Sequence, residues 1–430
     1  MKTRTSRLYV ACCLQEIAPR LKKTDPMATE KKPGRSRRRK RYNGVYKQKR
    51  RRHRENTRAH HSGDLSLVAA EGVLEVLSNN RGYLRSAKHR YCPNEQDVFV
   101  PPEIIKKLKL KTGCEIKGKA SSNKKTHRLQ SVESVMGISP EEFHLLTPFS
   151  QLTCIDPIEC FDLDRSNDPS LRIIDLITPI GKGQRSMIVA SPRTGKTILL
   201  KKLAGAITDF HSDVHLIVLL VDERPEEVTD FKRSVNAEVI YSSNDEPPSQ
   251  HLRVVEMVLE RARRMVEVGV DVVILLDSLT RVARAYNSQT KDRGRTLSGG
   301  LGARAMQKPR EFFGAARKVE DGASLTIVAT ALIDTGSRMD DVIFEEFKGT
   351  GNMELVLHRG LAEQRIWPAI DIKKSGTRKE EKLRSQEAQQ KVDLVRRALS
   401  AQSPQDALKV LLNKIEKTPS NKEFLRMLKA

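Results

Sequence analysis

The sequence predicts an α/β protein in which a parallel sheet is preceded by a small β-barrel and a basic N-terminal arm. Three observations lead to this prediction: a phosphate-binding loop at 190–197, later apolar runs that end in acidic residues, and short alternating segments between 67 and 135. The predicted parts are a basic disordered arm at 1–64, a barrel at 65–138, a connector at 139–170 and an α/β domain with C-terminal helices at 171–430.

The loop between Ala190 and Thr197 lies where a short apolar run gives way to a helical segment. This strand–loop–helix context is the one that a phosphate-binding loop requires, because N–H groups at the helix start point at the phosphates. Lys196 would reach the β- and γ-phosphates of ATP, and the Thr197 hydroxyl would hold Mg²⁺. Ala190 replaces the first glycine of the usual pattern. A Gly-Lys-Thr tripeptide also occurs by chance in helix-capping loops, so the loop alone leaves that alternative open.

Two later apolar runs, Val218–Glu223 and Val272–Asp277, end in acidic residues. Their length and β-branched content favour strands of a buried parallel sheet. An Asp at the carboxyl end of such a strand is where the second Mg²⁺ contact of phosphate-loop enzymes is expected, which points to Asp277. A helix at Gln250–Glu267, a buried strand at Ser324–Ala329 and helices within 379–428 complete the predicted domain.

The net charge of +24 is concentrated at the N-terminus. Residues 1–64 hold 21 Lys or Arg against five Asp or Glu, and Lys31–Arg58 holds 15 basic residues and one acid. Such blocks repel themselves and indicate a disordered arm that binds a polyanion through its phosphates. Tyr42 and Tyr46 lie among them and could stack on bases. A solubilising tail is the alternative.

Short, partly alternating segments separated by turn residues predict a five-stranded barrel of the oligonucleotide-binding type. They are Gly72–Leu77, Gly82–Ser86, Asp97–Val100, Cys114–Lys119 and Arg128–Val135. Tyr83 and Phe99 could stack on bases from a barrel face, or could be core residues. Further along, Ser288–Gly302 and Asp334–Arg338 are basic or glycine-bearing and lack a hydrophobic period. They suit loops that grip a nucleic-acid backbone, with ordinary surface loops as the alternative.

Composition also excludes several classes of protein. The six cysteines have no C-x-x-C spacing, so we expect reduced thiols rather than zinc or disulfides. No apolar stretch reaches 18 residues, so we expect no membrane span, and Leu8–Leu14 is too short for a signal peptide. Met27, which small residues follow, is an alternative start.

Several strings resemble the Rho family of transcription termination factors. They are Gly181–Gln184, the Lys196 loop, Val221–Val228, Asp277–Arg281, Phe312–Arg317, Ala331–Ser337 and Glu345–Asn352. The resemblance covers about residues 70–420 and implies a RecA-like ATPase domain behind a cold-shock-like barrel. It further implies a cytoplasmic, ring-shaped homohexamer, an ATP-driven helicase or translocase that acts on single-stranded nascent RNA. RNA polymerase and accessory termination factors would be its partners.

The resemblance also implies roles for individual residues. Lys196 and Thr197 would bind phosphate and Mg²⁺, with Asp277 as the second metal contact. Glu223 would polarise the attacking water, and Arg224 would couple the site to the neighbouring subunit. Arg378 resembles an arginine finger inserted from the next subunit, supported by Arg365, and Trp367 would stack on adenine. The remaining nucleotide-binding residues would be Arg193, Thr194, Gly195 and Ile198. The RNA-binding residues would be Tyr83, Arg85, Asp97 and Phe99 in the barrel, and Arg295, Ser298, Gly299, Gly300 and Arg338 in the loops at 290–302 and 334–340.

Four positions depart from the family pattern. Arg81 and Thr126 stand where base-stacking aromatics are expected, so the pyrimidine preference of the barrel stays open. Arg193 and Arg338 replace lysines, which keeps the charge and changes the geometry. Two other functions compete with an RNA-dependent motor: another RecA-like ring ATPase, such as a rotary ATP synthase subunit, and a non-motor RNA-binding protein whose nucleotide is structural.

Overall fold

The computed structural model describes residues 66–123, 126–290, 298–302 and 304–428. The predictions for the basic arm, including Met27, Tyr42 and Tyr46, and for Arg295 therefore lie outside the described residues. Residues 65–430 form one compact unit. Within the described ranges, no helix combines the length and apolarity that crossing a bilayer would require.

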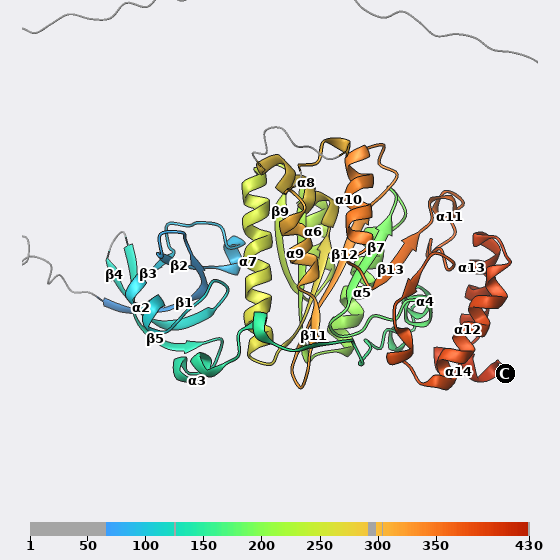
Figure 1. Ribbon diagram of the computed structural model, residues 1–430, viewed down its shortest axis with the longest axis horizontal. Coiled ribbons are helices and arrows are strands. Elements are labelled where there is room, and N and C mark those ends of the chain that lie inside the picture. Colours follow the sequence, from blue (N-terminus) through green and yellow to red (C-terminus); the bar gives the residue numbers. More distant parts are fainter. Residues whose placement is uncertain (1–65, 124–125, 291–297, 303, 429–430) are drawn as a thin grey trace, which may run out of the picture. The chain divides into compact units, whose positions relative to one another are not determined.

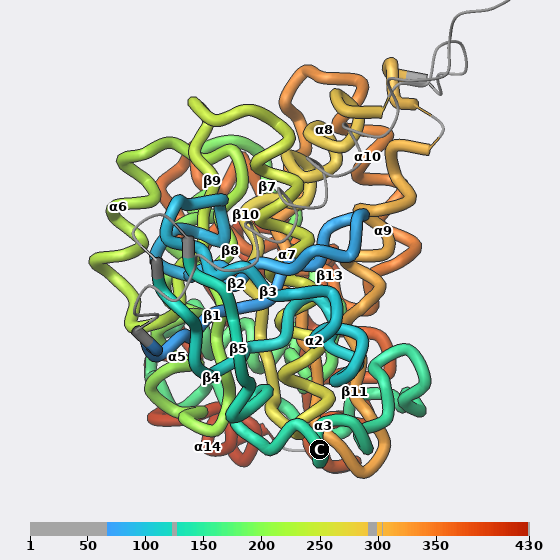
Figure 2. The backbone as a smooth tube through the Cα atoms, turned by 90° about the vertical axis from the view of Figure 1, so that its left-hand side faces the viewer, coloured from blue at the N-terminus to red at the C-terminus, as the bar shows by residue number. Residues whose placement is uncertain are grey.

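The N-terminal part of this unit is a closed five-stranded barrel, as the sequence predicted (Figure 2). Its strands are β1 (Ser66–Val76), β2 (Gly82–Arg85), β3 (Val98–Val100), β4 (Glu115–Asn123) and β5 (Thr126–Val135), with the helices η1 (Ala87–His89) and α2 (Pro102–Lys107). The order β1-β2-β3-β5-β4 closes through antiparallel pairing of β1 with β4. Alternate side chains such as Leu74, Leu84, Ile116 and Leu129 fill the interior.

A mixed nine-stranded sheet forms the centre of the second part (Figure 1). Its main path runs β14-β13-β7-β12-β10-β8-β9, and the five pairs from β13 to β9 are parallel. The strands are β6 (Cys154–Ile155), β7 (Arg185–Ala190), β8 (Val214–Glu223), β9 (Glu238–Ser243), β10 (Asp271–Asp277), β11 (Arg317–Val319), β12 (Ser324–Leu332), β13 (Met353–Leu357) and β14 (Gly376–Thr377). These strands read as apolar runs because helices cover both faces of the sheet.

The helices divide between the two faces because side chains alternate along each strand. Ile188 of β7 packs in the cluster that includes α4, α5, α12 and α13, whereas its neighbours Met187 and Val189 pack in the cluster of α7, α8, α9 and α10. The helices are α4 (Pro169–Ile177), α5 (Lys196–Phe210), α6 (Pro225–Ser234), α7 (Pro248–Glu267), α8 (Leu279–Gln289), α9 (Gln307–Gly314), α10 (Arg338–Lys348), α11 (Arg359–Glu363), α12 (Gln386–Ser400), α13 (Pro404–Ile415) and α14 (Asn421–Met427), with the short turns η4 (Ser298–Gly300) and η5 (Glu380–Lys382).

The segment predicted as a connector has more structure than its prolines suggested. It holds α3 (Pro140–Leu145), η2 (Phe149–Gln151), β6 and η3 (Asp164–Ser166). Pro140 starts α3 instead of breaking it, because a proline is tolerated at the first helical position and Ser139 and Glu142 form a capping box there. Strand β6 pairs with β11 and so joins the large sheet.

Candidate nucleotide and RNA sites

The phosphate loop follows β7 and ends where α5 begins at Lys196. Arg193 and Gly195 take φ values of 65° and 81°, and the Thr194 hydroxyl donates to the Ser191 carbonyl at 2.7 Å. The positive φ explains the glycine immediately before Lys196, since other residues are strained there. The loop therefore presents the N-terminus of a 15-residue helix, which is a ready site for an anion.

Two carboxylates lie opposite this loop. Lys196 Nζ is 2.5 Å from Asp277 Oδ1 and 3.7 Å from Glu223 Oε1. The carboxylates come together because β8 and β10 are parallel neighbours whose carboxyl ends share one edge of the sheet. Thr330, at the same edge in β12, donates from Oγ1 to Asp277 Oδ1 at 2.8 Å.

Glu223 is aimed into the site by an irregularity of its strand. The pairing of β8 with β9 shifts register between Val221 and Glu223, and Asp222 has a φ of 57°. A bulge of this kind redirects the next side chain, and such bulges are common beside active sites. Burial, then repulsion from Asp277, raises the pKa of Glu223 to about 7, while Lys196 and Arg281 act in the opposite direction. A carboxylate with a pKa near the working pH suits a group that orients or activates water.

The environment of Asp277 fits a magnesium ion. Its side chain is 1% exposed, and Oδ2 has no hydrogen-bond partner. An unpartnered buried carboxylate oxygen suits a hard cation or one of its waters, and Thr197 at the start of α5 offers a second oxygen. Mg²⁺ in such sites is held by one or two protein oxygens plus phosphates, which agrees with the lack of any described cluster of three or more His, Cys, Asp or Glu.

Trp367 lies against the phosphate loop. A Cβ atom added to Gly195 would lie 2.7 Å from Cζ3 of the indole, so only a glycine permits this approach. The ring is 43% exposed and borders a mainly apolar cavity of about 180 Å³ with Thr194, Ile198 and Leu357. An exposed indole beside a phosphate loop can stack on a base.

The structure separates the predicted arginines from this site. Arg378 follows β14, whose Thr377 pairs with Met353 at the start of β13, whereas the phosphate loop follows the end of β7. Arg378 therefore lies at the opposite edge of the sheet, where it is exposed and borders a cavity of about 220 Å³ with Arg185. Arg224 precedes α6 and is also exposed. Arg365 is exposed two residues before Trp367.

Three residues of the site escaped the sequence analysis as individuals: Asp222, Arg281 and Thr330. The nitrogen Nη1 of Arg281 donates to Asp222 Oδ2 at 3.0 Å, and its Nε lies 3.3 Å from Glu223 Oε1. The signal for Arg281 was its place one helical turn after Asp277. Thr330 could have been found as a polar residue near the end of an apolar strand.

The two predicted RNA loops meet at one place. Gly299 of η4 has a φ of 76°, and an added Cβ would lie 2.9 Å from the carbonyl oxygen of Arg338. Asn287 of α8 donates to the Gly300 carbonyl at 3.2 Å and accepts from the Gly302 N–H at 2.7 Å, which fixes the end of the first loop. Arg338 is exposed and starts α10, so its segment is more regular than predicted. Ser298 shares η4, and only its backbone is described.

On the barrel, Tyr83 and Phe99 form an exposed aromatic pair. They are register partners on β2 and β3, with ring centroids 5.7 Å apart and an interplanar angle of 62°. Both are only partly buried and lie outside the barrel core, so the core alternative is wrong. Arg128 of β5 lies 5.8 Å from the centroid of Phe99 and adds a cation to the same face.

Arg85 and Asp97 lie beneath this pair and are mostly buried. Their side chains are 5% and 6% exposed and are paired with each other, and Arg85 Nε also donates to Glu75 at 2.7 Å. The guanidinium of Arg85 lies 4.8 Å from the Tyr83 centroid, which supports the ring from behind. Both residues therefore act first as a framework for the aromatic face. Arg81 is exposed. Thr126 begins β5, and its side chain is not described.

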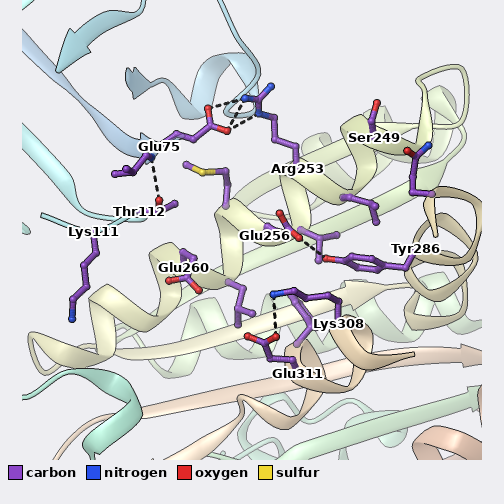
Figure 3. A pocket seen from close by; sticks show the side chains of 17 residues that line it. Glu75, Lys111, Thr112, Ser249, Arg253, Glu256, Glu260, Tyr286, Lys308 and Glu311 are labelled. Atoms are coloured by element: carbon purple, nitrogen blue, oxygen red, sulfur yellow. Dashed lines mark hydrogen bonds and ion pairs between the residues drawn. The ribbon is translucent and has the colours of Figure 1, made fainter. Parts of the chain in front are cut away.

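A cavity of about 820 Å³, larger than the one beside Trp367, lies where the barrel meets α7 (Figure 3). Glu75 reaches across it to Arg253, with two Oε1 contacts of 2.6 and 2.9 Å. The cavity walls also carry the pairs Glu256–Tyr286 and Glu311–Lys308. It lies away from the phosphate loop, so its size does not mark the site of ATP chemistry.

Comparison with known proteins assigns both parts of the unit. Residues 70–141 match the Rho termination factor RNA-binding domain, and residues 170–377 match the nucleotide-binding domain of the ATP synthase alpha/beta family. The transcription termination factor Rho of Cereibacter sphaeroides is 50% identical over 364 residues, covering 83% of this chain and 86% of the relative. The chain belongs to the Rho family.

Further relatives and one solved structure agree with this assignment. The transcription termination factor Rho of Aquifex aeolicus is 51% identical over 372 residues, with 85% of each chain covered. An ATPase of the type III secretion system is 22% identical, covers 72% of this chain and 92% of its own, and has a TM-score of 0.55. That likeness concerns the fold alone. The Rho-family barrel is an RNA-binding domain, and the sheet domain is an ATPase-type nucleotide-binding domain.

Proposed function

We propose that this Rho-family protein is an RNA-dependent ATPase that moves along single-stranded nascent RNA and terminates transcription at RNA polymerase. The observation that carries the proposal is the presence, in one compact unit, of a phosphate loop faced by Glu223 and Asp277 and of a Rho-type RNA-binding barrel. A rotary ATPase subunit does not need that barrel. A protein with a purely structural nucleotide does not need a buried Glu223 with a pKa near 7.

At the nucleotide, the chain supplies charge and position more than covalent chemistry, as phosphoryl transfer requires. Lys196 would neutralise the β- and γ-phosphates, and Trp367 would stack on adenine. Thr197 and Asp277 would hold Mg²⁺, which supplies further neutralisation of developing charge. Glu223, held by Arg281, would orient and polarise the attacking water.

The position of Arg378 favours a role in a neighbouring subunit. It lies on the sheet edge opposite to the phosphate loop, so it cannot reach a nucleotide bound to its own chain. A ring of subunits, six by family resemblance, would bring it to the next site, with Arg224 and Arg365 near that junction. An arginine finger supplied in trans is worth about 10³–10⁵ in rate, which makes hydrolysis depend on assembly.

RNA would contact two surfaces. Tyr83 and Phe99 would stack on bases at the barrel, and the loops around Gly299 and Arg338 would hold the strand in the centre of the ring. Because both loops join helices α8 and α10 that pack on the catalytic sheet, movement at the nucleotide can reach them.

The test is ATP turnover with and without single-stranded polycytidylate RNA. We expect strong stimulation in the wild type and none in Lys196→Ala or Glu223→Gln. Lys196→Ala should also weaken ATP binding, whereas Glu223→Gln should retain it, since Glu223 acts on water. Turnover that ignores RNA would favour the ring ATPase alternative, and binding without turnover would favour the non-motor one.

A mixing experiment tests the role of Arg378 in trans. Arg378→Ala should be inactive alone, and its intact phosphate loops should turn over in mixed rings beside a subunit that supplies the finger. Mixed rings of Arg378→Ala with Lys196→Ala should therefore regain part of the activity that neither variant has alone. No recovery in rings shown to be mixed would contradict a role in trans.

A further inference from the structure

A chain of polar contacts runs from the barrel to Glu223 and has no part in the nucleotide or RNA sites described above. Its members are, in order, Arg90, Glu246, Ser242, His251, Asp222, Arg281 and Glu223. Arg90 belongs to the barrel and the others to the ATPase domain. The chain therefore joins the RNA-binding part to the residue that we assign to the attacking water.

At the barrel end, Glu246 is shared between the two domains. Its Oε1 pairs with the guanidinium of Arg90, which follows η1 of the barrel. Its Oε2 accepts from the Ser242 hydroxyl at 2.6 Å and from the Ser243 N–H at 3.2 Å, at the end of β9. A movement of the barrel that withdraws Arg90 would therefore change the charge and position of Glu246.

In the middle of the chain, His251 lies in the first turns of α7 and is 4% exposed. Its Nδ1 is 2.7 Å from Ser242 Oγ, and its Nε2 is 4.0 Å from Asp222 Oδ1. Burial lowers the pKa of the ring, so near neutral pH it is uncharged and carries one N–H.

The hydrogen count gives this link two arrangements. Ser242 has one hydroxyl proton. When it goes to Glu246, Nδ1 of His251 must carry the ring hydrogen, and the lone pair of Nε2 faces the Asp222 carboxylate, which agrees with the 4.0 Å separation. When it goes to Nδ1 instead, Nε2 carries the hydrogen and can donate to Asp222. The tautomer of His251 thus depends on what Glu246 accepts.

At the catalytic end, Asp222 and Arg281 hold Glu223. Asp222 is the residue with positive φ in the bulge of β8, and its Oδ2 accepts from Arg281 at 3.0 Å. Arg281 Nε lies 3.3 Å from Glu223 Oε1 and lacks a hydrogen-bond partner, so the guanidinium can still turn toward Glu223. A new bond from His251 to Asp222 would compete for the carboxylate that now holds Arg281.

We propose that His251 is a positioning residue, through which the Arg90–Glu246 contact of the barrel sets the place of Arg281 and Glu223. The inference rests on the proposed function, because it concerns the residue that acts on water in RNA-dependent hydrolysis. Its two arrangements supply the bistable element that coupling between distant sites requires.

The experiment measures kcat and KM for ATP in the full chain with saturating polycytidylate. Arg90→Ala and His251→Ala should each lower kcat about 10- to 100-fold, the loss that a misplacement of about 1 Å produces, with little change in KM. The double variant should be no slower than His251→Ala, within about threefold, because both changes interrupt one chain. RNA affinity should be unchanged in all three.

Two further variants separate positioning from folding. His251→Asn keeps a donor near Nδ1 for Ser242 but cannot reach Asp222, so it should melt like the wild type and still lose kcat. Tyr91→Phe is the matched control: it removes barrel hydrogen bonds to Glu238 and Arg261, at 3.0 and 2.6 Å, that lie outside the chain. It should keep kcat within about threefold of the wild type, since additive effects are expected for uncoupled sites.

The outcomes distinguish the two proposals. If the wild type shows no RNA-stimulated turnover, or Glu223→Gln remains active, the proposed function fails and the positioning role fails with it. If those controls behave as proposed but the losses from Arg90→Ala and His251→Ala multiply, the positioning role alone is wrong. It is equally wrong if His251→Asn retains full kcat or if its loss appears in KM.

Discussion

Replacing Asp175 by asparagine should stabilise this protein at neutral pH and not in acid. Asp175 lies in α4, where its Oδ2 accepts from Asn421 Nδ2 of α14 at 2.9 Å. Burial raises the pKa of its carboxyl from 3.8 to about 6, despite the opposing effects of that hydrogen bond and of Arg384. The folded protein therefore bears a cost for ionising Asp175, whereas an asparagine carbonyl can accept the same hydrogen bond without a charge.

The size of the effect follows from the pKa. Each pKa unit corresponds to about 1.4 kcal/mol, so the change from 3.8 to about 6 is worth about 3 kcal/mol at most. Since Asp175 keeps some exposure to solvent, screening brings this to about 1–3 kcal/mol. At about 2–4 °C per kcal/mol, Asp175→Asn should raise Tm by about 3–10 °C at pH 7.5.

The sign of the pH dependence is fixed by linkage. A raised pKa in the folded state means that the stabilisation from the protonated carboxyl is complete below 3.8 and is lost as the pH rises through about 6. Scanning calorimetry should therefore show a gain for Asp175→Asn at pH 7.5 that shrinks toward pH 4. The exposed control Asp245→Asn removes the same charge and should stay within about 0.5 kcal/mol of the wild type. A lower Tm for Asp175→Asn at pH 7.5, or a gain independent of pH, would refute the reasoning.

Three further predictions concern the two binding sites. Gly195→Ala should raise KM for ATP about tenfold or more, because its φ of 81° and the 2.7 Å approach to Trp367 impose ~1–3 kcal/mol of strain, whereas Gly205→Ala in open space on α5 should be neutral in turnover assays. Phe99→Ala should weaken polycytidylate binding by ~1–3 kcal/mol through lost stacking and leave the salt dependence intact; unchanged affinity in a filter-binding titration would exclude a stacking role. Deleting residues 31–58 should do the reverse, flattening log K against log[salt] by about 0.7 per lost phosphate contact with base preference kept, and an unchanged slope would make the arm a solubility tail.

Elements that depend on neighbours in sequence could be predicted. The strand, loop and helix around Lys196 are local, since an apolar run, a glycine with positive φ and a helix start all lie within 15 residues. The runs ending at Glu223 and Asp277 were also predictable, because strands buried on both faces are apolar throughout. Strand order was not, because it depends on which apolar faces meet in space. The resemblance to a family supplied what periodicity could not.

The tertiary structure decided the roles that depend on distance between remote residues. The sequence identified Arg85 and Asp97 as binding residues, and packing placed them beneath the aromatic face as a buried pair. It placed Arg378 at the edge of the sheet opposite to the phosphate loop, which no spacing along the chain can show.

His251 is the clearest case, because its sequence neighbours give no sign of a link between Glu246 and Asp222. The sequence by itself determined which local segments fold and which chemical groups are present. Only the tertiary structure determined which of those groups come within bonding distance, because electrostatic and hydrogen-bond energies depend on separation in space and not along the chain.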